Sequence, residues 1–139
     1  MANIAKDLAI HIQQNTPYEN VSYSSMPDAP PDDPKAICVY EYDPGIGVKA
    51  IAPNVIPTAF RVACRAATYD EALAMSHEIF NLLKNVGNEM WGQKPLVVTG
   101  TEFVRILARG VPMKLKEDEQ HNIYTSQNFY TWINKKERF

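Results

Sequence analysis

The chain of 139 residues has little cysteine, little histidine and no surplus of basic charge. Its two cysteines are too few for the disulfide framework of a small secreted protein, and no zinc tetrad can be assembled around them. Its 14 lysines and arginines are outnumbered by 16 acidic residues, which argues against a dedicated nucleic-acid binder but leaves room for a local basic patch. Lys6, Asp7 and His11 interrupt the N-terminal apolar stretch, so we expect neither a signal peptide nor a membrane span there.

What is present fits one globular domain. Hydrophobic residues make up 45% of the chain and charged residues 22%, far from the composition of disordered proteins. The length suits a single domain and is too short for two of ordinary size. We therefore predict one soluble domain over residues 1–139, in a reducing compartment.

Two helices are predicted from apolar residues at helical spacing. Ile4, Leu8 and Ile12 form a narrow stripe near the N-terminus. A second helix over Thr68 to Val86 opens with a capping box, Thr68 with Glu71. We expect it to pack on a sheet through four apolar side chains: Met75, Ile79, Phe80 and Leu83.

The remaining ordered segments read as strands, with a weak one over 18–25 and clearer ones over 37–42, 58–66, 96–99, 102–109 and 123–134. The order of elements predicts an α+β fold, a single layer of mostly antiparallel sheet with both helices on one face. Three connections separate these elements: a proline-rich extended segment over 26–35, and long loops over about 43–57 and 110–122. The aspartates of 26–35 lack the glycine that a calcium loop needs.

No set of residues suits catalysis. The three histidines, His11, His77 and His121, lie in no catalytic or metal-binding motif. Cys38 and Cys64 fall at apolar positions within strands, where small buried hydrophobes are more common than reactive thiols. Glycines 45 and 47 form no phosphate cradle. We expect no enzymatic activity and no catalytic, cofactor-binding or metal-binding residue.

Two pairs of arginines stand out. Arg61 and Arg65 lie four apart on one predicted strand, and Arg105 and Arg109 four apart on another, so each pair projects to one side. If that side faces outward, it is shared by Ala63, Phe103 and Leu107. Such a face suits a protein interface, but it could also be an ordinary solvated face. An RNA-binding sheet would need exposed aromatic rings, and only Phe103 qualifies.

Two further segments are candidate interface elements. The 43–57 loop carries too many apolar residues for a free loop, among them Ile46, Val48 and Ile51. The acidic run of Glu117, Asp118 and Glu119 is a candidate partner for the arginines in a neighbouring subunit of a head-to-tail ring.

From Met26 onward the chain resembles the tail terminator proteins of long-tailed bacteriophages, also called tail-completion or minor capsid proteins. The resemblance lies in MPDAPP leading into ICVYEY, in FRVACRAATYDEALAMSHEIFNLL, and in the closing YTSQNFYTW. It covers about four-fifths of the chain. The sequence differs where the family tends to carry a Gly-Arg pair before the last strand, since Asp118–Asn122 stands there instead.

The resemblance implies a structural role in the virion. Such proteins form a ring, commonly a hexamer, that caps the head-proximal end of the tail tube, ends tube polymerisation and joins the tail to the neck. The implied partners are further copies of the chain, the tail tube protein and a neck stopper protein, with DNA passing through the lumen unbound and no membrane involved. Assembly would take place in the host cytoplasm. The alternative is a small nucleic-acid-binding or adaptor module without catalysis.

Overall fold

The computed structural model describes residues 3–28, 33–42, 55–88 and 94–134. Within them the elements follow the predicted order. They are α1 (Ile4–Asn15), β1 (Val21–Tyr23), β2 (Ala36–Tyr42), β3 (Val55–Ala66), α2 (Tyr69–Leu83), β4 (Leu96–Val98), β5 (Thr101–Glu117) and β6 (Ile123–Asn134). The strands form one sheet in the order β1-β2-β3-β6-β5-β4, in which β1 and β2 are parallel and the other pairs antiparallel. The predicted α+β fold with a mostly antiparallel sheet is confirmed.

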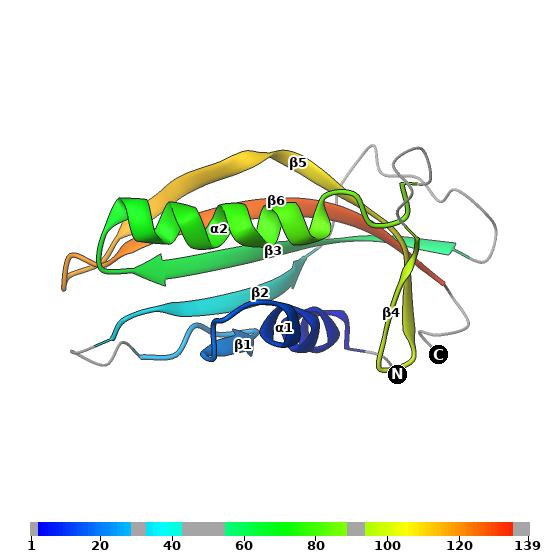
Figure 1. Ribbon diagram of the computed structural model, residues 1–139, viewed down its shortest axis with the longest axis horizontal. Coiled ribbons are helices and arrows are strands. Elements are labelled where there is room, and N and C mark those ends of the chain that lie inside the picture. The colour runs from blue at the N-terminus through cyan, green and yellow to red at the C-terminus, as the bar shows by residue number, and fades with distance from the viewer. Residues whose placement is uncertain (1–2, 29–32, 43–54, 89–93, 135–139) are drawn as a thin grey trace.

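One face of the sheet carries the core. Both helices lie on it, with α2 along β3, β6 and β5 and α1 against β1 and β2 (Figure 1). Phe60 and Phe129 stack at the centre of this face with ring centroids 4.9 Å apart. The sheet curls so that α1 also contacts β4, and the Thr101 hydroxyl donates to the buried carboxylate of Asp7 at 2.6 Å. We call the opposite, helix-free side the outer face.

Helix α2 begins as predicted but presents a narrower apolar stripe. The Thr68 hydroxyl accepts a hydrogen bond from the Glu71 backbone N–H at 3.2 Å, which satisfies one free donor of the first turn. Ile79 and Leu83 are buried in the core. Phe80 is only half-buried, because it lies beside that stripe, where Lys84 Nζ covers its ring at 5.3 Å. The prediction that Phe80 is a core residue is wrong.

The predicted loop over 110–122 is mostly strand. Strand β5 continues to Glu117 and pairs with β6, which leaves only Asp118–Asn122 as the connection. The segment reads as a loop because most of its side chains are exposed and polar. A shift of register between Arg109 and Met113 absorbs Pro112, which cannot donate to a ladder.

The loop predicted over 43–57 is shorter as well, since β3 begins at Val55. Ile46, Val48 and Ile51 lie outside the described residues. No helix in the described parts of the chain is both long and apolar enough to cross a membrane.

Candidate functional site

The outer face of the sheet carries the four arginines of the predicted interface and Leu107. Along β6 the side chains alternate strictly, with every inward residue buried and every outward residue half-buried. The outward set is Tyr124, Ser126, Asn128, Tyr130, Trp132 and Asn134. This incomplete burial makes the outer face a surface available to a partner.

Arg65 is a buried residue of this face rather than part of an open surface. It is 2% exposed. Its Nε donates to the Pro34 carbonyl at 2.7 Å, and its Nη1 donates to the Pro27 carbonyl. The described parts of the proline-rich connector, residues 26–28 and 33–35, therefore lie against Arg65 on the outer face, and we refer to them as the connector. The prediction that Arg65 belongs to an exposed assembly surface is wrong, because a segment distant in sequence covers it.

The other three arginines remain partly or fully accessible. Arg61 is half-buried and its Nε donates to Asn128 Oδ1 at 2.9 Å. Arg105 is half-buried in register with Trp132. Arg109 is exposed, with its guanidinium 5.5 Å from the centre of the Tyr130 ring. No carboxylate of the described residues forms an ion pair with any of these arginines.

Phe103 points the opposite way from the prediction. A register shift between Phe103 and Arg105 reverses the alternation of β5, so Phe103 is fully buried in the core together with Ile106. Leu107 does lie outward and is 40% exposed. The outward position predicted for Phe103 is therefore wrong.

The aromatic rings of the outer face come from other strands. Tyr40 and Tyr42 on β2 share it with the three aromatic residues of β6, namely Tyr124, Tyr130 and Trp132. Burial, together with a hydrogen bond to the Cys38 side chain, raises the pKa of Tyr40 to about 12. Sequence reasoning missed these rings, although the alternation of ICVYEY and YTSQNFYTWIN could have placed them on one face.

A cleft of about 1320 Å³ opens on this face between the connector and the turn that joins β5 to β6. Its lining combines cations, carboxylates and tyrosines. It includes Arg61, Arg65, Lys116, Asp118, Glu119 and Tyr124. Two of the four arginines, Arg61 and Arg65, thus line one cleft of the same chain together with Asp118 and Glu119. The prediction put the arginines and the acidic run on two surfaces that meet between subunits.

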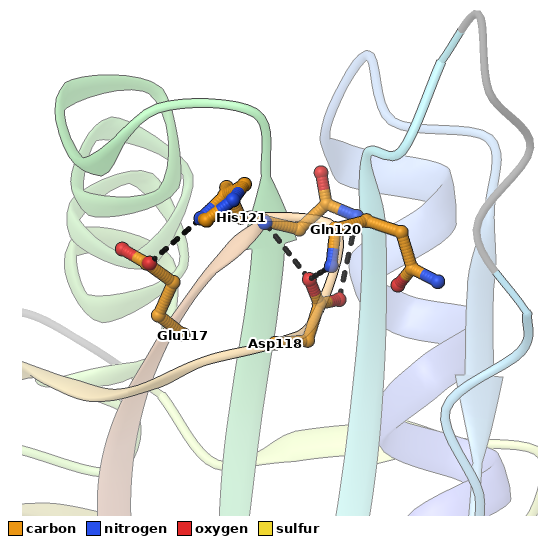
Figure 2. Close-up of polar contacts among 5 residues, drawn as sticks. Glu117, Asp118, Gln120 and His121 are labelled. Atoms are coloured by element: carbon orange, nitrogen blue, oxygen red, sulfur yellow. Dashed lines mark hydrogen bonds and ion pairs between the residues drawn. The ribbon is translucent and has the colours of Figure 1, made fainter.

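The acidic turn is held by its own hydrogen bonds (Figure 2). Asp118 Oδ1 accepts from the backbone N–H groups of Gln120 at 3.0 Å and Asn122 at 2.9 Å. Partial burial raises the pKa of Asp118, but the hydrogen bonds from Asn122, Gln120 and Tyr124 outweigh it and leave the pKa below its usual value. Glu117 pairs with His121 at 3.2 Å. Within the acidic run, Glu119 is an exposed carboxylate that lines the cleft.

Comparisons with known proteins find the fold but no sequence family. No family model and no curated protein matches the chain. A solved chain from the virion of a native gene transfer agent (GTA) particle matches with a TM-score of 0.60 and 13% identity, over 91% of each chain. The fold is shared with a GTA virion protein. A second solved structure matches with a TM-score of 0.53 and 14% identity, over 94% of this chain and 90% of that chain.

The outer face carries its polar groups in an arrangement suited to binding. The described residues hold no group of three or more side chains that could bind a metal ion. Both cysteines are buried, and burial raises the pKa of the Cys64 thiol to about 12. The outer face offers arginine forks, aromatic rings and a cleft, which can stack against a partner and bind carboxylate or phosphate groups.

Proposed function

We propose that the chain is a phage-type virion structural protein that forms a homo-oligomeric ring, a hexamer as in the tail terminators, at the head-proximal end of a tail tube. The observation that carries the proposal is the fold shared with a GTA virion chain over nine-tenths of both chains. The resemblance of the MPDAPP, FRVACRAATYDEALAMSHEIFNLL and YTSQNFYTW segments to tail terminators supports the finer role.

In this role the ring ends tube polymerisation and joins the tail to the neck. Its partners are neighbouring copies, the tube protein and a neck stopper protein, and DNA passes through the lumen. The chain is assembled in the host cytoplasm and carries no enzymatic activity. Arg105 and Arg109, with Tyr130 and Trp132 beside them, are among the accessible residues of the predicted interface. Arginine and aromatic side chains are enriched at protein interfaces, which supports assembly through this part of the outer face.

A second candidate function is nucleic-acid binding on the outer face. Five aromatic side chains share that face with Arg61, Arg105 and Arg109. Rings flanked by cations are the pattern by which sheets stack single-stranded bases. This function requires an affinity that falls steeply with salt concentration, because phosphate contacts release counterions.

The test uses the cognate tail tube protein polymerised with and without the purified chain, with tube lengths measured by electron microscopy. We expect tubes that stop at the added chain and no salt-dependent binding to a labelled oligonucleotide. A double variant, Arg105→Ala with Arg109→Ala, should cap tubes poorly. Lys6→Ala with Lys94→Ala removes the same charge elsewhere and should cap normally. Tubes of unchanged length with the unmodified chain would refute the proposal.

A further inference from the structure

The cleft on the outer face contains two arginines that have no counterion within the described residues. Arg61 and Arg65 both line it, and no described carboxylate lies within ion-pair distance of either. Among the described residues, Arg61 donates only through Nε, to Asn128, and Arg65 donates through Nε and Nη1 to the connector. The Nη2 group of Arg65 is buried and has no hydrogen-bond partner there. Guanidinium N–H groups are therefore left over in this cleft.

The other charged groups of the cleft are either hydrogen-bonded or exposed to water. Asp118 is held by hydrogen bonds within its own turn. Asp28, Glu119 and Lys116 are exposed, and the Lys116 ammonium also lies 4.7 Å from the centre of the Tyr124 ring. Water solvates these exposed charges, whereas a buried charge without a partner costs free energy. The group that the two arginines lack is an anion.

The floor of the cleft has a further free donor and room for a ligand. The Tyr42 hydroxyl is buried and has no hydrogen-bond partner among the described residues. Ala63 lies between Arg61 and Arg65 on β3, and its small side chain fills little of the space between them. The volume of about 1320 Å³ exceeds the roughly 300–1,000 Å³ of pockets that hold single small ligands. The cleft can therefore accommodate several residues of a peptide.

The exposed charges distinguish a peptide from a nucleic acid as the ligand. A nucleic-acid strand carries a phosphate on every nucleotide, so phosphates beyond the first would face the carboxylates of Asp28 and Glu119. A peptide can place one acidic side chain on the floor and basic side chains beside those carboxylates. The planar fork of arginine binds a carboxylate through two hydrogen bonds.

We infer that the cleft binds a peptide segment of a partner protein in which an acidic residue is flanked by basic ones, with the acidic side chain at Arg61 and Arg65. The inference goes beyond the proposed ring and does not depend on it, because one chain supplies the whole lining of the cleft.

The test titrates the full, ¹⁵N-labelled chain with the terminally blocked peptide Gly-Lys-Glu-Lys-Gly and follows the arginine side-chain N–H signals by NMR. We expect the signals of Arg61 and Arg65 to shift and saturate, while that of Arg109 stays in place. The control peptide Gly-Lys-Gln-Lys-Gly has the same shape without the carboxylate and should bind about tenfold more weakly or worse. Inorganic phosphate and a thymidine oligonucleotide are titrated in parallel and should bind more weakly than the glutamate peptide.

Three variants locate the site. Arg61→Gln removes one guanidinium from the floor and should lower the affinity for the glutamate peptide about tenfold or more. Lys114→Gln removes an exposed cation of β5 that does not line the cleft, so the affinity should stay the same. Glu119→Lys reverses a charge that faces the basic residues of the peptide and should weaken binding about threefold or more. If Arg61→Gln does not fold, the two peptides still decide the matter on the unmodified chain.

Three results would overturn the inference. The first is equal affinity for the glutamate and glutamine peptides, and the second is the absence of any shift at millimolar peptide. The third is tighter binding of phosphate or of the oligonucleotide, which would assign the floor of the cleft to a phosphate group. The proposed ring is tested separately, by tube lengths and by light scattering.

Discussion

The two arginine-bearing strands of the outer face have the same spacing of charges and different surroundings. On β3, Arg65 is buried and its guanidinium is bonded to carbonyls of the connector. On β5, Arg109 is exposed and lies over a tyrosine ring. Arg65 of β3 is therefore part of the internal structure, while Arg109 of β5 is open to a partner. Spacing along a strand decides which face a side chain takes, but not what covers that face.

The first prediction concerns the two faces of β5. Phe103→Ala should lower the free energy of unfolding by about 3–5 kcal/mol, because the ring is fully buried in the core. Leu107→Ala should cost less than about 1 kcal/mol, because the side chain is partly exposed. Urea denaturation of both variants measures the difference. Equal costs would show that the register shift does not reverse the strand.

The second prediction compares the two arginines directly. Arg65→Ala leaves the Pro34 and Pro27 carbonyls without their donor, at a cost of roughly 1–3 kcal/mol for each unsatisfied group. Arg109→Ala should change stability by no more than about 0.5 kcal/mol. Urea denaturation of the two variants measures both changes in the free energy of unfolding. A stable Arg65→Ala protein would mean that the connector does not depend on this guanidinium.

The third prediction uses the two cysteines as reporters of the two faces. Cys64 lies in the core and Cys38 on the outer face, in register with Ala63. In the unmodified protein neither thiol should react with a maleimide, because both are fully buried. Arg65→Ala frees the connector and should make Cys38 react while Cys64 stays protected, which mass spectrometry of labelled peptides resolves. Equal labelling of both would indicate global unfolding instead.

The smallest expected effect concerns the turn between β5 and β6. The hydrogen bonds to Asp118 lower its pKa in the folded protein, so its ionised form contributes stability above the unfolded value of 3.8. That contribution is lost as the pH falls through the lower folded pKa. Asp118→Asn should therefore melt below the unmodified protein at neutral pH and match it well below pH 3.8. A gap of constant size across this range would rule out the charge of Asp118 as its cause.

Local patterns predicted much of the fold. The order of elements, the Thr68 cap of α2 and the inward alternation of β3 all depend on residues close in sequence, and the structure contains them. The errors involve features that local patterns do not encode. Because Lys114 and Lys116 are polar, the second half of β5 was predicted to be a loop. A register shift turns the Phe103 side chain to the core face instead of the outer face.

The candidate site was predicted less well than the fold. Its arginines were found from spacing alone, but the burial of Arg65 depends on a connector about 30 residues away in the chain. The rings of the outer face were missed, since they come from β2 and β6 rather than from the arginine strands. Predicting such a surface requires the order of strands in the sheet, which long-range pairing determines.

The most direct test of the central claim is the mass of the assembled chain, measured by light scattering over a range of concentrations, alone and with the cognate tail tube protein. The account predicts a discrete closed oligomer, six times the 15.7 kDa of one chain, in at least one of these conditions. A monomer at every concentration, with and without the tube protein, would contradict it.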